Sequence, residues 1–200
     1  WVPSIGIIEA PYVWRDVSHM LDAMNGPIGQ EFNEQLIANK GIRILGTTYY
    51  GMRHLSSSQK KVEYLRDMKN FKLRVPENEV FMAMAESWGA KPSPLNFNEL
   101  YLALKTNVVD GQENPLPTID SAHFYEVQKY IVLTGHIITP RLVVINEDLY
   151  QSLSSESQKI LRDAVSDAIE WQNEQILQKE KNLINQFKSK GVIIINPKVE

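Results

Sequence analysis

Three polar side chains stand together after an apolar stretch in the segment VVDGQENP, residues 108–115. We expect residues 108–110 to form a strand and Gly111 to let the chain turn at the carboxyl edge of a sheet, where ligands gather. Asn114 offers a donor and an acceptor, which together can read a hydroxyl and a carboxylate oxygen. The structural alternative is that Asn114 caps a helix that Pro115 opens. At the level of this segment both interpretations stay open.

An arginine lies near the end of a second short strand. In FKLRV, residues 71–75, alternation separates the apolar side chains from Lys72 and Arg74, and Pro76 ends the strand. Composition alone favours a solvated surface for Arg74. Its place near a carboxyl edge instead makes it a candidate carboxylate clamp, because a planar guanidinium matches a carboxylate in a way that lysine cannot.

Other candidates have weaker signals. Arg53 follows Gly51, which would permit close approach of a ligand. A surface arginine whose side chain packs on a tyrosine ring fits equally well. Phe97 stands near a predicted helix start, where apolar residues are usually core. His54 and His136 fit structural roles, and no two histidines have metal-ligand spacing. We therefore expect no metal site and no cofactor.

Composition narrows the class of protein. The 200 residues hold 21 basic and 24 acidic side chains, a net charge of -3, so no basic field points to nucleic acid. The absence of cysteine excludes a disulfide framework and a cysteine-based zinc site. No apolar run reaches membrane-spanning length, so we expect no membrane span in this chain. The sequence starts abruptly at Trp1 without a signal peptide, and we expect a mature or truncated product.

Helical periodicity alternates with short apolar strands, which predicts an α/β fold with largely parallel pairing. The predicted helices cover residues 27–40, 64–68, 78–88 and 96–105, and the predicted strands cover residues 42–45, 71–75, 108–110 and 137–145.

The last fifty residues predict one long helix. Ser155 and Gln158 form a possible capping box, and helix formers continue to Lys190, before Gly191. About 35 residues would give a length of roughly 50 Å, more than one small domain needs. We expect this helix to cross two lobes. A coiled-coil arm is the alternative, but the apolar stripe does not hold a heptad register.

Four longer segments occur in one order: YYGMRHL, FKLRVPENEVF, WGAKPSPLNFNELYLALKTNVVDGQENP and FYEVQKYIVLTGH. Together they resemble the DctP-type solute-binding proteins of TRAP transporters, the tripartite ATP-independent periplasmic carriers of bacteria. The similarity runs from about residue 11, through GPIGQEF, to the C-terminal helix. The resemblance implies a two-lobed periplasmic binding protein-like fold, with the long helix bridging the lobes. Members of the family begin with further strands and helices, so we expect the N-terminal elements to be missing here.

The resemblance also implies a division of the chain and a set of ligand contacts. Residues 1–51 would be the remainder of lobe I, 52–138 lobe II, 139–154 the crossover back to lobe I, and 155–200 the bridging helix and a terminal strand. By motif, the implied ligand-binding residues are Arg74 of LRVP as a bidentate carboxylate clamp, Arg53 of YGMR, Asn114 of QENP, Phe97 of PLNF, and His136 of LTGH in a polar network behind the pocket.

The function that the resemblance implies is transport. An extracytoplasmic, periplasmic protein would bind a small organic acid in a cleft between its lobes and deliver it to the membrane subunits of a TRAP transporter. Sugar acids, sialic acid, dicarboxylates and 2-oxo acids all fit. A ligand-sensing domain of the same fold is one alternative. A hydrolase or lyase using Glu113 and Asp110 is another, but no nucleophile motif or phosphate loop supports an enzyme.

Overall fold

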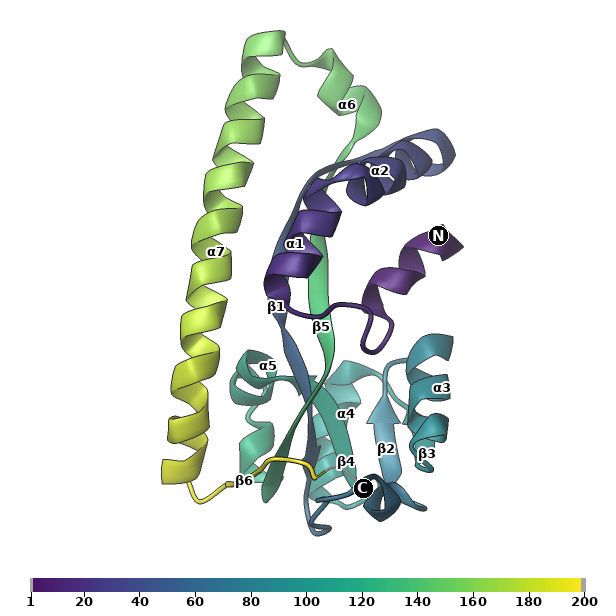
Figure 1. The fold of residues 1–200 in the computed structure, drawn as a ribbon, viewed down its shortest axis with the longest axis vertical. Coiled ribbons are helices and arrows are strands. Elements are labelled where there is room, and N and C mark those ends of the chain that lie inside the picture. The colour runs from purple at the N-terminus through teal and green to yellow at the C-terminus, as the bar shows by residue number, and fades with distance from the viewer. Residues whose placement is uncertain (1, 199–200) are drawn as a thin grey trace. The chain divides into compact units, whose positions relative to one another are not determined.

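The computed structural model describes residues 2–198, which divide into two compact units. Unit 1 lies within Trp1–Tyr50 and Ile138–Gln178, and unit 2 within Gly51–Ile137 and Lys179–Glu200. Three long elements, visible in Figure 1, contribute residues to both units: β1 (Ile42–Ser57), β5 (Tyr130–Asn146) and α7 (Ser155–Ser189). The α/β fold class is confirmed.

Unit 1 combines helices with residues 42–50 of β1 and residues 138–146 of β5. Gly29 lets α2 begin close to the end of α1, because a Cβ there would lie 1.7 Å from the Met24 carbonyl oxygen. Arg43 on β1 forms a two-bond ion pair with Glu147 at the start of α6, with distances of 2.6 and 2.7 Å. The remaining elements of this unit are η1 (Pro3–Glu9), α1 (Val17–Asn25), α2 (Pro27–Lys40) and α6 (Glu147–Ser152).

Helix side chains satisfy backbone groups of β1 in unit 1. The Ile44 N–H donates to Asn33 Oδ1 of α2 at 2.7 Å, and the Tyr49 N–H donates to Asn173 Oδ1 of α7 at 2.7 Å. Gln172 of α7 donates to the Tyr49 carbonyl oxygen at 2.9 Å. Since an unpaired buried amide costs free energy, these polar side chains fix the helices to the strand in the way that a further strand would.

Unit 2 is built on a mixed sheet. The strand order is β3-β2-β4-β1-β5-β6, with β2 parallel to both β3 and β4, β5 parallel to β6, and β1 antiparallel to β4. The expectation of largely parallel pairing therefore holds only in part, because β1 runs antiparallel to β4. The elements are η2 (Leu65–Met68), β2 (Lys72–Val75), α3 (Glu79–Ser87), β3 (Lys91–Pro94), α4 (Phe97–Lys105), β4 (Gly111–Pro115), α5 (Leu116–Ser121), η3 (Phe124–Glu126) and β6 (Ile193–Ile195).

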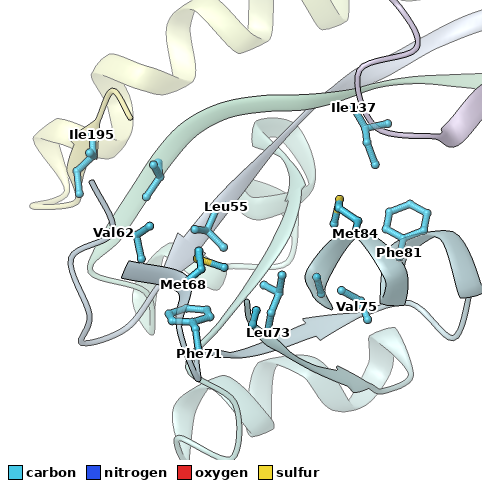
Figure 2. Close-up of a cluster of buried hydrophobic side chains, with 13 residues drawn as sticks. Leu55, Val62, Met68, Phe71, Leu73, Val75, Phe81, Met84, Ile137 and Ile195 are labelled. Atoms are coloured by element: carbon cyan, nitrogen blue, oxygen red, sulfur yellow. The ribbon is translucent and has the colours of Figure 1, made fainter. Parts of the chain in front are cut away.

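Two apolar clusters hold unit 2 together. The first, drawn in Figure 2, gathers Leu55, Leu73 and Phe71 from the strand region with Phe81 and Met84 of α3. The second contains Leu100 and Leu104 of α4, Ile119 of α5, and Leu183 and Phe187 of α7. The end of α7 is thus anchored in unit 2 by the same apolar stripe that the sequence shows.

The strand predicted at residues 108–110 is wrong. Asn107 has a φ of 57°, so a left-handed turn follows α4, and Val108 is 58% exposed. The strand begins instead at Gly111, where a Cβ would lie 2.0 Å from the Ser56 carbonyl oxygen. Only glycine allows β1 and β4 to approach so closely at this point.

Other boundaries also differ. Residues 42–45 are only the start of β1, because the strand continues through a polar and aromatic stretch that lacks the apolar run used to place it. The predicted capping box of Ser155 and Gln158 is wrong, because Ser154 caps α7 instead: its Oγ accepts the Ser157 N–H at 3.1 Å, and the helix begins at Ser155. The helix α1 was not predicted; Asp16 caps it by accepting the His19 N–H at 2.8 Å.

His54 links β1 to β5 inside unit 2. Its Nδ1 accepts the Gly135 N–H at 3.0 Å, and the side chain is buried. Burial, with a smaller contribution from His136, lowers the pKa of His54 from 6.5 to about 3. The imidazole is therefore neutral in the folded protein, whereas it gains a proton in the unfolded chain near its ordinary pKa.

We expect the protein to lose stability as the pH falls from about 6.5 towards 3. Because the folded pKa of His54 lies below the unfolded one, its contribution is complete above the unfolded pKa and is lost on acidification. The slope from one such histidine is at most about 1.4 kcal/mol per pH unit. Urea unfolding between about pH 7 and pH 4 measures it, and His54→Asn, whose amide oxygen can still accept a hydrogen bond, should lower the slope by that amount. An unchanged slope would show that His54 titrates near its ordinary pKa.

Candidate functional site

The five residues proposed from the sequence all lie in unit 2, on different elements. Arg53, Arg74, Asn114 and His136 come from β1, β2, β4 and β5, and each is buried. Phe97 is the first residue of α4 and is 45% exposed, so it is not a core residue. The sheet therefore brings four of the five into its interior.

Arg53 is neutralised by a buried carboxylate. Its Nε and Nη2 donate to the two carboxylate oxygens of Glu113 at 2.5 and 2.8 Å, and Nη2 also donates to the Glu113 carbonyl oxygen. Burial by itself would raise the pKa of the Glu113 carboxyl, but Arg53 and His136 together hold that pKa below its usual range. Glu113 is thus ionised although it is fully buried, because the bidentate geometry offsets the cost of desolvation.

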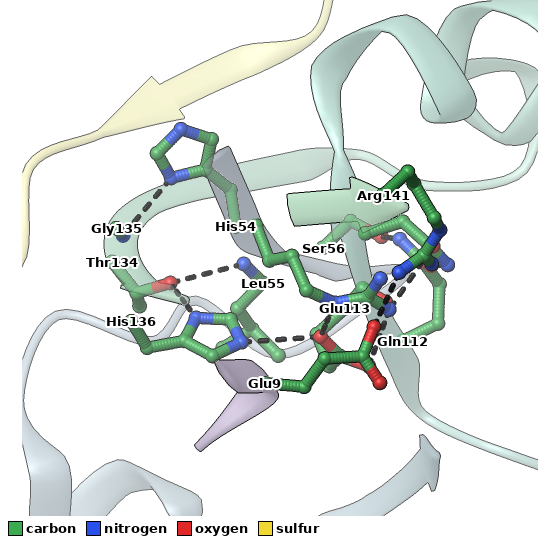
Figure 3. Close-up of polar contacts among 12 residues, drawn as sticks. Glu9, His54, Leu55, Ser56, Gln112, Glu113, Thr134, Gly135, His136 and Arg141 are labelled. Atoms are coloured by element: carbon green, nitrogen blue, oxygen red, sulfur yellow. Dashed lines mark hydrogen bonds and ion pairs between the residues drawn. The ribbon is translucent and has the colours of Figure 1, made fainter. Parts of the chain in front are cut away.

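His136 supports the same carboxylate from β5, as Figure 3 shows. Its Nε2 lies 3.1 Å from Glu113 Oε2, and its Nδ1 lies 2.8 Å from Thr134 Oγ1. The Leu55 N–H donates to the same Thr134 hydroxyl at 3.3 Å. Burial lowers the pKa of His136 in spite of the nearby Glu113. A neutral ring then donates from Nε2 to Glu113 and accepts at Nδ1 from Thr134.

A chain of amides holds Arg53 from β4. Arg53 Nη2 donates to Asn114 Oδ1 at 3.1 Å, and Asn114 Nδ2 donates to Gln112 Oε1 at 2.6 Å. Gln112 Nε2 donates in turn to Ser56 Oγ at 2.8 Å. Asn114 therefore does not cap the following helix, since α5 has no side-chain cap. The turn expected at Gly111 is also wrong, because Gln112, Glu113 and Asn114 lie within β4 and are 0%, 0% and 5% exposed.

Arg74 has a different environment from Arg53. Its Nε and Nη2 both donate to the Leu95 carbonyl oxygen, at 3.0 and 2.5 Å, and the residue is 4% exposed. Within residues 2–198 no carboxylate forms an ion pair with it. Burial lowers the pKa of the Arg74 guanidinium, Arg53 lowers it further, and Glu113 and Glu77 raise it. The solvated-surface alternative is wrong, because Arg74 is buried. Among residues 2–198, no carboxylate pairs with the end of the guanidinium that faces away from Leu95.

The buried charges of this cluster do not cancel. Glu113 balances Arg53, and the neutral rings of His54 and His136 add nothing. The charge of Arg74 remains uncompensated by any buried acid in the part of the chain that the structure describes. An anion with a planar, bidentate head is the partner that such a guanidinium accepts best.

Phe97 lies apart from this hydrogen-bonded network. Its ring centroid is 5.6 Å from that of Phe124, and its exposed fraction leaves the other side of the ring accessible. The sequence offered Glu113 only to the enzyme alternative, and the implied ligand-binding residues did not include Gln112 or Thr134. Thr134 and His136 are two apart on one strand and so share a face, which was the available signal for Thr134.

The two carboxylates of the enzyme alternative are committed elsewhere. Glu113 pairs with Arg53, and Asp110 Oδ2 accepts the Lys72 N–H at 2.8 Å. Among the residues placed in the structure, no group of three histidine, aspartate or glutamate side chains is arranged to hold a metal ion. A search of the described helices finds none with the length and apolar character needed to cross a membrane.

Known proteins resemble this chain along its length. The sialic acid-binding periplasmic protein SiaP of Vibrio cholerae is 36% identical over 200 residues, which are 100% of this chain and 62% of that protein. A TRAP periplasmic solute-binding protein of Roseobacter denitrificans, with bound 3-deoxy-D-manno-oct-2-ulosonic acid, matches with a TM-score of 0.94 and 32% identity over 98% of this chain and 66% of that one. The sugar acid binding protein of Advenella mimigardefordensis, in complex with galactonate, matches with a TM-score of 0.91 and 30% identity, covering 98% and 63%.

The family and these relatives are named as binding proteins, which supports binding over the hydrolase or lyase alternative. The chain spans about 62% of the length of the curated relative. The family model for bacterial extracellular solute-binding proteins matches residues 1–200. The chain therefore belongs to the DctP family, bacterial extracellular solute-binding protein family 7.

Proposed function

We propose that this protein is the extracytoplasmic solute-binding component of a TRAP transporter and that it binds a sugar acid by its carboxylate. The observation that carries this proposal is the buried Arg74 guanidinium, which has no paired carboxylate among the described residues. The sugar acids named for the two solved relatives, and the sialic acid named for SiaP, all carry a carboxylate.

The chemistry of Arg74 supports a carboxylate rather than a neutral sugar. A buried cation is costly unless an opposite charge and hydrogen bonds accompany it. The Leu95 carbonyl engages the Nε side of the guanidinium, so a carboxylate would approach the terminal nitrogens. Two parallel charge-assisted hydrogen bonds would then complete the charge balance of the cluster.

The other residues take supporting roles in this proposal. Asn114, already bonded to Arg53 and Gln112, has one amide hydrogen left for a ligand hydroxyl or carboxylate oxygen. Phe97 offers an exposed aromatic face to the C–H side of a sugar. His136 acts from behind by holding Glu113, and Arg53 contributes through its fixed position beside Asn114.

Delivery of the acid to membrane subunits, and a periplasmic location, complete the proposal. The family supports both. The proposed lobe at residues 52–138 is supported by the second compact unit, whose first segment, Gly51–Ile137, contains residues 52–137 of that stretch. A ligand-sensing role would use the same binding chemistry. Adjacent genes for a small and a large membrane subunit would favour transport over sensing.

The test of ligand class uses the chain within its complete gene product. Mass spectrometry after denaturation should identify a small acid that co-purifies, and calorimetry should compare sialic acid, 3-deoxy-D-manno-oct-2-ulosonic acid, galactonate and succinate. Galactitol is the matched control, because it replaces the galactonate carboxylate with a hydroxymethyl group. We expect at least one sugar acid to bind and galactitol to fail. Equal binding of galactonate and galactitol would rule out recognition through a carboxylate.

The ranking of the site residues is a second prediction. Arg74→Ala should weaken binding of the preferred acid by roughly 2–5 kcal/mol, because it leaves a desolvated carboxylate unpaired. Asn114→Ala should cost about 1–3 kcal/mol, since it removes weaker hydrogen bonds. Arg74→Lys should fail almost as badly as Arg74→Ala, because a point charge cannot reproduce the fork.

Calorimetry on these three variants measures the ranking. Lys72→Ala is the matched control, a cation exposed on the same strand two residues earlier. Its affinity should remain at the wild-type value. Binding by Arg74→Lys within a few-fold of wild type would show that Arg74 is not the carboxylate clamp.

A further inference from the structure

We propose that Glu180 of α7 is a positioning residue for Arg53. Glu180 Oε1 accepts the backbone N–H of Met52 at 2.8 Å. Met52 directly precedes Arg53, whose guanidinium is bonded to Glu113 and Asn114. By fixing the backbone one residue before the arginine, Glu180 sets the direction in which that side chain leaves β1. All of these residues belong to unit 2.

The Met52 amide needs an acceptor from outside the sheet. The Leu55 N–H faces Thr134 on β5, and because amide directions alternate along a strand, the Met52 N–H faces the β4 side. The β1–β4 pairing begins only at Arg53, opposite Pro115, and Pro115 is the last residue of β4. The Met52 amide therefore lies just beyond the ladder, where a carboxylate satisfies it with a charge-assisted hydrogen bond.

Helix packing aims Glu180 at this amide. Leu183 and Phe187 are 1% and 0% exposed and belong to the second apolar cluster of unit 2. Glu180 precedes them by three and seven residues, so it lies on the same face of α7. The core contacts of one end of the helix thereby fix a polar side chain one turn away.

Gly51 gives independent support. Its φ is +138°, and a Cβ there would lie 2.6 Å from Pro115 Cβ and 3.1 Å from Glu180 Oε1. The position therefore accepts only glycine while both the proline and the carboxylate stay against the backbone. A side chain of α7 also accepts a backbone N–H of β1 in unit 1, where Asn173 accepts the Tyr49 N–H.

Amide hydrogen exchange by NMR on the ligand-free chain tests the inference. In Glu180→Ala, the Met52 N–H and the Arg53 Nε–H should both exchange at least about tenfold faster. The Met52 N–H loses its acceptor. The Arg53 side chain then starts from a backbone that is no longer held, so its bond to Glu113 opens more often. Glu180→Gln keeps an acceptor oxygen and should restore both rates to within about threefold of wild type. Glu174→Ala removes an exposed acid from the same helix and should change neither rate.

Two results would overturn the inference. The first is an unchanged Met52 rate in Glu180→Ala. The second is a faster Met52 rate with an unchanged Arg53 Nε–H, which would make Glu180 a local cap only. Melting temperatures identify any variant that unfolds, and the Glu180→Gln comparison then decides.

The effect on affinity, but not the exchange result, rests on the proposed function. Calorimetry with galactonate on Arg74→Ala and Glu180→Ala separates the two. An unaltered affinity in Arg74→Ala would contradict the proposed function and leave the exchange result standing. Weaker binding by Arg74→Ala, with wild-type affinity in Glu180→Ala, would contradict the positioning role alone.

Discussion

The buried ion pair between Arg53 and Glu113 is stable only if neighbouring strands satisfy the remaining hydrogen-bonding groups of both side chains. Desolvating two ions costs several kcal/mol each, and the attraction between them offsets that cost only when the remaining hydrogen-bonding groups are satisfied. His136 supplies a donor to Glu113 from β5, and Asn114 supplies an acceptor to Arg53 from β4. The close pairing of β1 with β4, which Gly111 permits, puts the two ions within reach. Removing any of these contacts would leave a buried charge incompletely paired.

The same network explains why Arg53 is paired with a carboxylate while Arg74, in the same unit, is not. Arg53 is held on several sides and has its charge cancelled, so it acts as a fixed part of the sheet. Arg74 is bonded to one carbonyl oxygen, which orients the guanidinium without cancelling its charge. A rigid, desolvated and uncancelled cation is well prepared for an anionic ligand, since little ordering remains to be done on binding. Glu113 and Asn114 of β4 thus fix Arg53 and, through Glu113, cancel its charge, whereas neither forms such a bond with Arg74 in the described residues.

Helix α7 contributes contacts to each of the two units. Its apolar residues enter the core of unit 2, while Asn173 and Glu180 bind backbone amides of β1 within their respective units. Within unit 2, the bond from the Met52 amide to Glu180 holds β1 just before its pairing with β4 begins. This end of α7 is therefore part of the framework of unit 2.

The sequence by itself determined the elements whose apolar residues recur with a regular period, including Pro27–Lys40, α7 and the strand that carries Arg74. It also supplied the residue types of the site, because guanidinium and amide groups have few substitutes in carboxylate recognition. Only the tertiary structure decided that Gln112, Glu113 and Asn114 are buried in a strand, since polar residues on a buried strand give no apolar alternation to detect. The partner of Arg53 likewise depends on the register of β1 against β4, which brings together residues sixty positions apart. The residues close to Arg53 in the sequence therefore do not indicate that Glu113 is its partner, because register is set by the packing of the whole sheet.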